Sequence, residues 1–442
     1  MEPSVDDMAG DLEALSLKSP ATTATAGSEA ADWTASAGLA LSPTKKPHMK
    51  PGDPCWAAVG RARSADLSLG GLRVIRRLGS GDIGSVYLVE LKCAGGCVFA
   101  AKVMDKKELE GRDKERRART ERGILELLDH PFLPTLYATL ESPRWCCLLT
   151  EFCPGGDLHV LRERQPGKRF DAAAAAVRFY ASEVVVALEY LHMMGIVYRD
   201  LKPENILVKA DGHIMLTDFD LCLTSTSTAQ IVSAQQNPLP SFSSDHSINN
   251  PSSANSVCMP PSCMAPAVSW LRPKRKRQGR SGPRGSSALA VVAEPIDARS
   301  MSFVGTYEYL APEIVLGEGH GSAVDWWTLG IFIFEFFYGV TPFKGSNHEH
   351  TLANIVAGAL EFPKKPPLAE SAKDLITRLL IKDSKKRMGS TMGATAIKRH
   401  PFFNGVNWAL LRCTTPPFLP RPMAYKKSVA GDDCPDASLE YF

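Results

Sequence analysis

The sequence has no apolar run long enough to cross a membrane and no strong excess of charge of either sign. A membrane-spanning helix needs about 18–20 consecutive apolar residues, and no stretch of the 442 residues approaches that length. The 51 Lys and Arg residues nearly balance the 48 Asp and Glu residues, for a net charge of +3. Any affinity for phosphates or lipids must therefore come from a local cluster of basic residues.

Targeting signals and metal-ligand spacings are also missing. The amino terminus is acidic and lacks the basic and apolar regions of a secretory signal. Glu2 stands where myristoylation requires glycine. The eleven Cys residues show no repeating metal spacing, and Cys146, Cys147 and Cys222 lie inside apolar runs. Reduced core cysteines are typical of a cytoplasmic protein, so we expect a cytoplasmic chain that meets membranes, if at all, from their cytosolic surface.

Composition and periodicity divide the chain into a leader, a domain of two lobes and a tail. Residues 1–71 are rich in Ala, Ser, Thr, Gly and Pro and are predicted to be a disordered leader. Residues 72–403 begin with strand patterns and one surface helix, pass a Pro-Gly-Gly break, and continue with helical patterns. This order predicts an α+β fold with a β-rich N-terminal lobe and a helical C-terminal lobe. Residues 404–442 are assigned to a C-terminal tail.

A Ser-, Pro- and Asn-rich segment interrupts the helical lobe. Residues 223–299 are far longer than an ordinary loop and have no period, which predicts a disordered insertion. Trp270 and Leu271 precede a basic run from Arg272 to Arg284. Such a run binds anionic lipids at about 1 kcal/mol per basic residue or acts as a nuclear localisation signal. We favour the lipid interpretation because Trp270 and Leu271 suit a membrane interface, and nuclear localisation stays open.

A glycine-rich turn joins the first two predicted strands. Its glycines let backbone N–H groups approach phosphate oxygens. A dinucleotide-binding fold has the same glycine spacing but continues as a helix, whereas Ser85 to Val89 continues as a strand. The turn therefore predicts an ATP-binding loop of the protein kinase type. Its residues are Leu78, Gly79, Ser80, Gly81, Asp82, Ile83, Gly84, Ser85 and Val86.

Further ATP-binding candidates follow along the same lobe. Lys102 lies one strand later, where its ammonium group can pair with the α- and β-phosphates. Glu121 on the next helix can hold Lys102 in an ion pair, and its register against the apolar positions favours it over Glu115 and Glu126. Glu151 lies at the predicted hinge between the lobes and is also assigned to the ATP site.

The segment from Tyr198 to Asn205 has the spacing of a protein kinase catalytic loop. In that pattern Asp200 accepts the proton of the substrate hydroxyl and Asn205 binds a magnesium ion. Lys202 is placed to neutralise charge on the transferred phosphoryl group, and lysine at this position is typical of serine/threonine kinases. The loop therefore predicts phosphoryl transfer to Ser or Thr.

Two later motifs complete the set that phosphoryl transfer requires. Asp218, in Asp218-Phe219-Asp220, supplies a second ligand for Mg²⁺. Ala311-Pro312-Glu313 closes the activation segment, and Glu313 is expected to pair with Arg387 as a structural contact. The order and spacing of these motifs predict an ATP- and Mg²⁺-dependent protein kinase with the bilobal kinase fold.

Residues 72–403 resemble the AGC group of protein kinases. The third residue of Asp218-Phe219-Asp220, the long insertion and the stretch from His400 to Trp408 are similar to the plant-specific branch of that group, and Gly81-Asp82-Ile83-Gly84 is similar to its PINOID-like members. Because Asp tolerates positive backbone angles less readily than Gly, Asp220 is expected to bias the balance between active and inactive loops.

The resemblance also implies partners and regulation. It implies Ser302 as the activation-loop phosphosite and Ser300 as a second candidate, with the phosphate paired to Arg199. It further implies an upstream phosphoinositide-dependent kinase, plasma-membrane association, and substrates among the PIN auxin efflux carriers with a role in auxin signalling. Three acidic residues fall where related kinases hold basic substrate side chains, although they could also be plain surface carboxylates. They are Asp157, Glu204 and Glu335.

Two other classes of protein remain as alternatives. In a non-catalytic scaffold, Asp220 would hold the site closed, but the chain retains Lys102, Asp200 and Asp218. A nucleic-acid-binding module would need aromatic residues interleaved with the basic run, and that run has none. We therefore expect a monomeric enzyme with protein substrates and no nucleic-acid partner.

Overall fold

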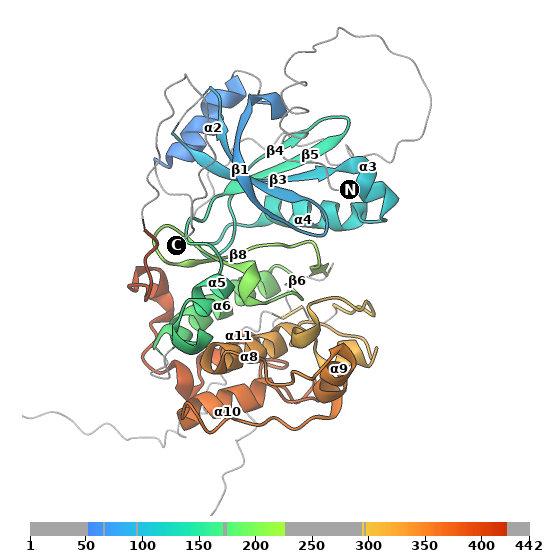
Figure 1. Ribbon diagram of the computed structural model, residues 1–442, viewed down its shortest axis with the longest axis vertical. Coiled ribbons are helices and arrows are strands. Elements are labelled where there is room, and N and C mark those ends of the chain that lie inside the picture. The colour runs from blue at the N-terminus through green and yellow to red at the C-terminus, as the bar shows by residue number, and fades with distance from the viewer. Residues whose placement is uncertain are drawn as a thin grey trace, which may run out of the picture. The chain divides into compact units, whose positions relative to one another are not determined.

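The computed structural model describes residues 52–64, 67–93, 96–170, 175–225, 294–295 and 298–421 (Figure 1). The predictions for the basic run from Arg272 to Arg284, for most of the insertion and for the end of the tail lie outside these residues. None of the helices in the described ranges combines the length and apolar character that a membrane span requires.

The N-terminal lobe is built on an antiparallel five-stranded sheet with the order β1-β2-β3-β5-β4. Apolar residues on one face of these strands belong to one buried cluster, which includes Phe99 and Leu149. Helix α4 buries Glu121 together with apolar side chains on the same face. The elements are β1 (Leu72–Ser80), β2 (Ser85–Leu91), β3 (Val98–Asp105), α3 (Lys106–Gly111), α4 (Glu115–Leu127), β4 (Leu136–Glu141) and β5 (Trp145–Glu151).

A helix precedes this sheet inside the expected leader. Helix α2 (Pro54–Ser64) contacts β4 and β2 and buries Ala58, Val59 and Ala62 (Figure 1). The Trp56 ring lies 5.0 Å from the Tyr137 ring, and the Tyr137 hydroxyl donates a 3.0 Å hydrogen bond to Asp53. The prediction of a leader without structure up to residue 71 is therefore wrong for α2. Small apolar residues on one helical face resemble low-complexity sequence until their partner sheet is known.

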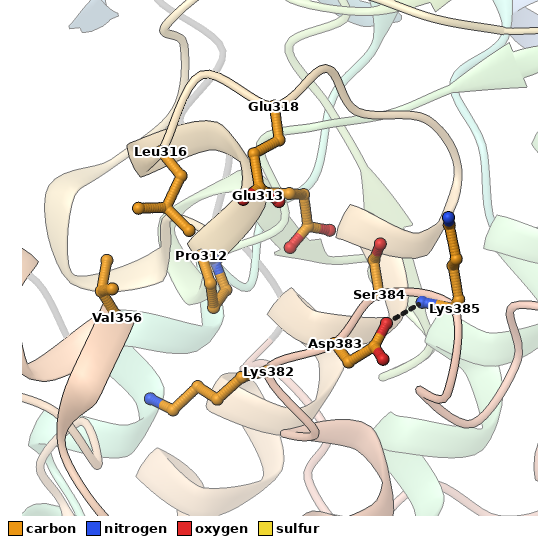
Figure 2. Close-up of a pocket in the computed structure, with 9 residues that line it drawn as sticks. All are labelled: Pro312, Glu313, Leu316, Glu318, Val356, Lys382, Asp383, Ser384 and Lys385. Atoms are coloured by element: carbon orange, nitrogen blue, oxygen red, sulfur yellow. Dashed lines mark hydrogen bonds between the residues drawn. The ribbon is translucent and has the colours of Figure 1, made fainter.

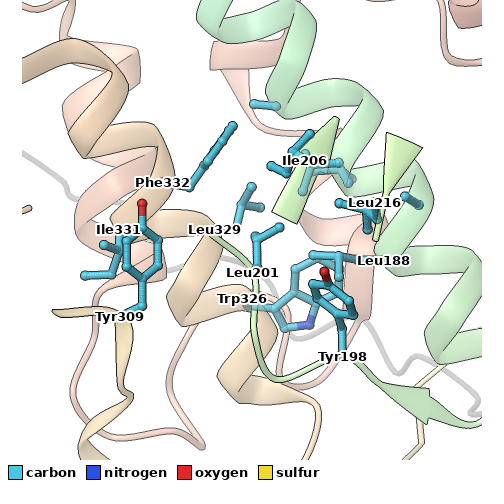
Figure 3. Close-up of a cluster of buried hydrophobic side chains, with 14 of the residues drawn as sticks. Leu188, Tyr198, Leu201, Ile206, Leu216, Tyr309, Trp326, Leu329, Ile331 and Phe332 are labelled. Carbon is cyan, nitrogen blue, oxygen red and sulfur yellow. The ribbon is translucent and has the colours of Figure 1, made fainter. Parts of the chain in front are cut away.

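The C-terminal lobe is mainly helical. Helix α8 is buried along nearly its whole length, as expected for a helix that is apolar on all sides. Figure 3 shows Trp326, Leu329 and Phe332 of this helix in the cluster that includes Leu201 of the catalytic loop. The helices are α5 (Leu158–Glu163), α6 (Ala175–Met193), α7 (Pro312–Val315), α8 (Ala323–Tyr338), α9 (His348–Ala357), α10 (Glu370–Leu379) and α11 (Gly393–Lys398).

Short strands frame the catalytic loop. Strands β7 (Ile206–Val208) and β8 (Ile214–Leu216) form one antiparallel pair, and β6 (Ile196–Val197) and β9 (Leu223–Thr224) form another. Brief 3-10 turns lie before the first strand of the N-terminal sheet, within the C-terminal lobe and in the first part of the tail. They are η1 (Leu69–Gly71), η2 (Pro166–Lys168), η3 (Pro203–Asn205), η4 (Tyr307–Tyr309), η5 (Pro401–Phe403) and η6 (Trp408–Cys413).

Both ends of the expected insertion belong to the folded lobe. Leu223 and Thr224 pair with β6, and Glu294 is buried against His192 with a 3.1 Å contact between Oε1 and Nδ1. Ser300 pairs with His320 in an isolated bridge just beyond it. The predicted boundaries of 223 and 299 are therefore too wide, because backbone pairing and a buried ion pair leave no trace in local composition.

Candidate active site

Lys102 joins three segments of the chain by two ion pairs. Its Nζ lies 2.8 Å from a Glu121 oxygen on α4 and 2.8 Å from Asp218 Oδ1. The rival acidic residues on α4 are used elsewhere, since Glu115 pairs with Arg119 and Glu126 pairs with Arg122. The structure thus forms the Lys102–Glu121 pair expected from the helical register.

The charges of this group depend on one another. Although burial opposes the effect, Glu121 and Asp218 raise the pKa of Lys102, and the ammonium group stays protonated. Lys102 likewise holds the pKa of Asp218 below its usual range against the effect of burial. Burial raises the pKa of Glu121, with Lys102 opposing the rise. The arrangement supplies a fixed positive charge beside two carboxylates, which suits binding of phosphate oxygens.

The glycine-rich loop runs from the end of β1 into the start of β2. Its amide at Gly81 donates to the Gly84 carbonyl at 2.8 Å, which closes the turn. Ile83 is buried, while residues 79–82 at the tip are exposed. Only glycine fits at position 84, because a Cβ atom there would lie 2.5 Å from the Val103 carbonyl oxygen. Leu78, Ser85 and Val86 lie in the two strands at the base of the loop, where Val86 is the register partner of Lys102.

Three polar side chains surround the Asp200 carboxylate, two from the catalytic loop and one from the activation segment. The Lys202 Nζ and Asn205 Nδ2 atoms lie 2.8 Å and 2.9 Å from Asp200 Oδ2. The Thr306 hydroxyl, from the activation segment, donates to Asp200 Oδ1 at 3.3 Å and accepts from Lys202 at 3.0 Å. Burial raises the pKa of Asp200, and Lys202 and Asn205 oppose the rise. Sequence reasoning missed Thr306, which lies 106 residues from Asp200.

The backbone of the catalytic loop is held by a buried carboxylate from α8. Asp325 accepts from the amide nitrogens of Tyr198 and Arg199 at 2.8 Å and 2.7 Å. Arg199 adopts a left-handed φ of 67°, a conformation that costs about 1–2 kcal/mol outside glycine. The two hydrogen bonds that the Tyr198 and Arg199 amides donate to the Asp325 carboxylate are charge-assisted, and they offset that cost. Nothing in the sequence around Asp325 had marked it for this role.

Asp218 and Asn205 each carry a side-chain oxygen that could hold a hard divalent cation. Asn205 donates through its amide nitrogen, so its carbonyl oxygen is the atom left for a cation. Asp218 has a left-handed φ of 63°, and its carboxylate accepts from Lys102. In the described ranges no three His, Cys, Asp or Glu side chains gather as a metal site. The arrangement still fits Mg²⁺, which takes one or two protein ligands together with nucleotide phosphates and water.

Comparison with known proteins settles the family. The protein kinase domain matches residues 72–268 and 288–403. The chain belongs to the protein kinase family. It is 53% identical to the serine/threonine-protein kinase AGC1-5 of Arabidopsis thaliana over 86% of this chain and 64% of that relative. It is 48% identical to protein kinase PINOID 2 of Oryza sativa subsp. japonica over 86% of this chain and 84% of the relative.

A further relative is protein kinase PVPK-1 of Phaseolus vulgaris, 50% identical over 90% of this chain and 66% of that protein. The chain thus spans just under two thirds of the length of two of these three relatives. Their similarity places it among the plant AGC serine/threonine protein kinases. A domain of this family uses ATP and a divalent cation and acts on protein substrates.

The activation segment of the kinase brings Ser300 and Ser302 to one arginine. Both hydroxyl oxygens lie 3.0 Å from Arg199 Nη1, and the His320 ring lies 3.3 Å from the same nitrogen. Burial and Arg199 lower the pKa of His320 to about 4, so this ring is neutral near pH 7. A phosphate on either serine would meet a guanidinium group already in position.

Other site candidates take separate places in the kinase. Glu151 ends β5, and its carboxylate pairs with Lys209 at 2.8 Å. Asp157 caps α5 by accepting from the Val160 amide. Glu204 lies 3.1 Å from His159, and the buried Glu335 is held by Arg162 at 3.1 Å. Of the three predicted substrate-binding acids, Glu204 is the most open to solvent.

A separate cavity of about 410 Å³ lies in the C-terminal lobe (Figure 2). The buried Arg387 pairs beside it with both oxygens of Glu313, at 2.6 Å and 2.8 Å, which is the contact expected from the sequence. No residue of the glycine-rich or catalytic loop contributes to the cavity, so it is distinct from the site around Asp200. It is lined by Pro312, Glu313, Leu316, Glu318, Val356, Lys382, Asp383, Ser384 and Lys385.

Proposed function

We propose that this kinase transfers the γ-phosphoryl group of Mg-ATP to Ser or Thr of protein substrates, with Asp200 as the base that orients and deprotonates the hydroxyl. The observation that carries the proposal is the double ion pair of Lys102, 2.8 Å from both Glu121 and Asp218. This arrangement requires the phosphate-binding lysine, the helix and the cation-binding segment to be in place together. Kinase activity depends on those same contacts.

Each polar group then has a place in the reaction. Asp200 takes the proton of the substrate hydroxyl, and Lys202 at 2.8 Å from it offsets charge on the transferred group. Lys102 pairs with the phosphates, and the loop from Leu78 to Val86 covers them with backbone N–H groups. Asp218 and Asn205 would hold Mg²⁺. When bound, Mg²⁺ neutralises charge that develops on the phosphate oxygens.

The proposed role of Glu151 is limited to the hinge. It ends β5, the strand that precedes the link to the larger lobe, and its backbone borders the expected ATP site. Its carboxylate already pairs with Lys209, so it contributes to the shape of the hinge and not to catalysis.

Phosphorylation of Ser302, with Ser300 as a second site, is proposed to order the activation segment. Arg199 lies beside the proposed base Asp200 and already meets both hydroxyl groups at 3.0 Å. A phosphate would replace these neutral contacts by charge-assisted hydrogen bonds. The upstream kinase is proposed to be of the phosphoinositide-dependent type, on the resemblance alone.

Substrates are proposed to carry Arg or Lys upstream of the phosphoacceptor. The exposed Glu204 carboxylate is proposed as the main contact for such a residue. Asp157 and Glu335 are the other two acids that the resemblance implies for this role. The test compares γ-phosphoryl transfer to a Ser peptide with upstream Arg and to the matched peptide with Gln. A clear preference for the Arg peptide is expected, and equal rates would contradict this part of the proposal. A Tyr acceptor peptide serves as the control for hydroxyl specificity.

The cellular part of the proposal is regulation of auxin transport and auxin signalling through PIN-type efflux carriers. It is supported by the likeness of residues 81–84 to PINOID-like kinases and by the similarity to protein kinase PINOID 2. We expect efficient phosphorylation of a cytosolic PIN loop. If the purified kinase phosphorylates the Arg peptide but not the loop, the auxin role fails while the kinase activity stands.

Location is proposed to be cytoplasmic, with peripheral attachment to the plasma membrane through Arg272–Arg284. A fluorescent fusion lacking residues 270–284 should lose its peripheral signal. Unchanged peripheral signal would refute the lipid role of the basic run, and loss of a nuclear signal would instead favour a localisation sequence. Binding to lipid vesicles but not to DNA, weakened by salt, is expected of the purified chain, which we propose to be monomeric.

A further inference from the structure

Arg117 of α4 bridges two acidic side chains from different segments. One guanidinium nitrogen, Nη1, donates to Asp82 in the glycine-rich loop, 35 residues away. The other, Nη2, donates to Asp220, 103 residues away and two residues after Asp218. The bridge therefore ties the tip of the phosphate-binding loop and the cation-binding segment to one side chain of the helix between them.

The distinctive feature of Asp220 is its buried side chain, because its backbone is not strained. Asp220 is not among the described non-glycine residues with a positive φ, although Asp218 and Arg199 nearby are. The backbone strain expected from replacing Gly by Asp is therefore absent. Its side chain is only 4% exposed. A buried carboxylate needs a partner, because an isolated charge is costly to remove from water. Arg117 is the partner that the structure gives it.

Asp82 has further cations around it. Its carboxylate also accepts from Lys114 and from Arg112 at 3.2 Å. Arg112 and Lys114 lie between α3 and α4, and Arg117 lies in the first turn of α4. The tip of the loop is therefore held to the beginning of α4. The Asp82 side chain is 46% exposed, so each of these pairs alone contributes little. Arg117 differs from the other two because it also reaches the buried Asp220.

We propose that Arg117 is a positioning residue, and that the Asp82–Arg117–Asp220 bridge holds α4 in the place where Glu121 reaches Lys102. The inference rests on the proposed phosphoryl transfer. Arg117 and Glu121 are four residues apart, so they project from the same face of the helix. A displacement of α4 would break the Lys102 pair and the bridge together. The planar guanidinium of Arg117 presents a separate nitrogen to each carboxylate, Nη1 to Asp82 and Nη2 to Asp220.

The test compares Arg117→Met with Arg119→Met in the full-length kinase. Arg119 lies on the same helix, is exposed, and pairs with Glu115 of that helix. We expect Arg117→Met to lower kcat and to raise KM for ATP, each by about tenfold, the size of one lost charge-assisted hydrogen bond. Arg119→Met should stay within about twofold of the wild type.

Further variants distinguish the contribution of the Arg117–Asp82 contact from that of the Arg117–Asp220 contact. In Arg117→Met the Asp220 carboxylate is left buried beside Asp218. Adding Asp220→Asn removes that unpaired charge but does not rebuild the bridge, so kcat should stay lowered. KM for ATP should stay raised in that double variant, because the anchor on Asp82 is still missing. Asp82→Asn alone should raise KM for ATP with little change in kcat. Recovery of kcat in the double variant would mean that the unpaired carboxylate, and not the lost bridge, lowers kcat, and would overturn the inference. A merely structural role of Arg117 would not separate KM from kcat in Asp82→Asn.

Hydrogen exchange tests the bridge without relying on phosphoryl transfer. Hydrogen exchange of backbone amides in residues 79–86 and 218–222 should be faster in Arg117→Met than in Arg119→Met. If Arg117→Met does not fold, Arg117→Lys replaces it, with the same direction expected. Equal exchange and equal kinetics in the two variants would overturn the inference. An inactive wild type with altered exchange in Arg117→Met would refute the phosphoryl transfer and support the bridge.

Discussion

Replacing Arg387 by Met should destabilise the C-terminal lobe strongly. The Arg387 side chain is 0% exposed and pairs with both oxygens of Glu313, at 2.6 Å and 2.8 Å. It also donates to three backbone carbonyls, those of Ile381, Ala323 and Lys382. Removing one partner of a buried pair costs about 3–5 kcal/mol, because the other charge is left unpaired.

The expected change is large enough for ordinary thermal denaturation. At about 2 °C per kcal/mol for a domain of this size, Tm should fall by about 6–10 °C. Arg378→Met is the matched control, since Arg378 forms an exposed pair with Asp374 on α10. Such a pair contributes about 0.5 kcal/mol or less, so Tm should fall by about 1 °C.

A double variant can show whether the loss of stability comes from the unpaired Glu313 carboxylate or from removal of the Arg387 side chain itself. If the unpaired Glu313 carboxylate is what destabilises Arg387→Met, then adding Glu313→Leu should recover much of the lost Tm, because no buried charge remains. A single variant that unfolds like the Arg378 control would refute the reasoning. So would a double variant that is no more stable than the single one.

Three further predictions concern the loop, a buried histidine and the activation segment. Gly84→Ala should raise KM for ATP and lower Tm, because its Cβ would lie 2.5 Å from the Val103 oxygen. A Cβ at position 79 would have no atom within 4 Å, so Gly79→Ala should leave Tm unchanged. Equal changes of Tm in the two variants would contradict this prediction. Against the effect of burial, Glu294 and Asp325 raise the pKa of His192 to about 10, so its contribution to stability should be complete below pH 6.5 and lost as pH rises toward 10. The free energy of unfolding measured over that range should fall more in the wild type than in His192→Gln, and parallel curves would refute the assignment. Ser302→Ala should lower turnover by about tenfold or more, the size of one charge-assisted hydrogen bond, and unchanged turnover of the activated enzyme would exclude Ser302 as the regulatory site.

The motif residues could be predicted because each motif is local. The residues from Tyr198 to Asn205 lie within one loop, and the register of α4 pointed to Glu121 over its neighbours because helical periodicity determines which side chains share a face. A contact between distant segments could be predicted only where phosphoryl transfer requires it, as between Lys102 and Asp218. The identity of the fold therefore followed from short patterns in the right order.

Contacts between distant segments without such a pattern could not be predicted. Asp325 lies 126 residues from the Arg199 amide that it binds, and Arg117 lies 103 residues from Asp220. Helix α2 was missed because its apolar face is small and can be recognised as a packing surface only once the sheet that it contacts is known. The true ends of the insertion were missed for the same reason, since Glu294 is held by a histidine on α6.

The central claim is that Asp200 is the base for phosphoryl transfer from Mg-ATP. The direct test is single-turnover transfer of radiolabelled phosphate to a basic Ser peptide by the activated wild type and by Asp200→Ala, with Mg-ATP binding measured in both. We predict that the variant binds Mg-ATP normally and loses transfer by at least about a hundredfold. Transfer at the wild-type rate by Asp200→Ala, or none by an activated and ATP-bound wild type, would contradict the account and favour a non-catalytic scaffold.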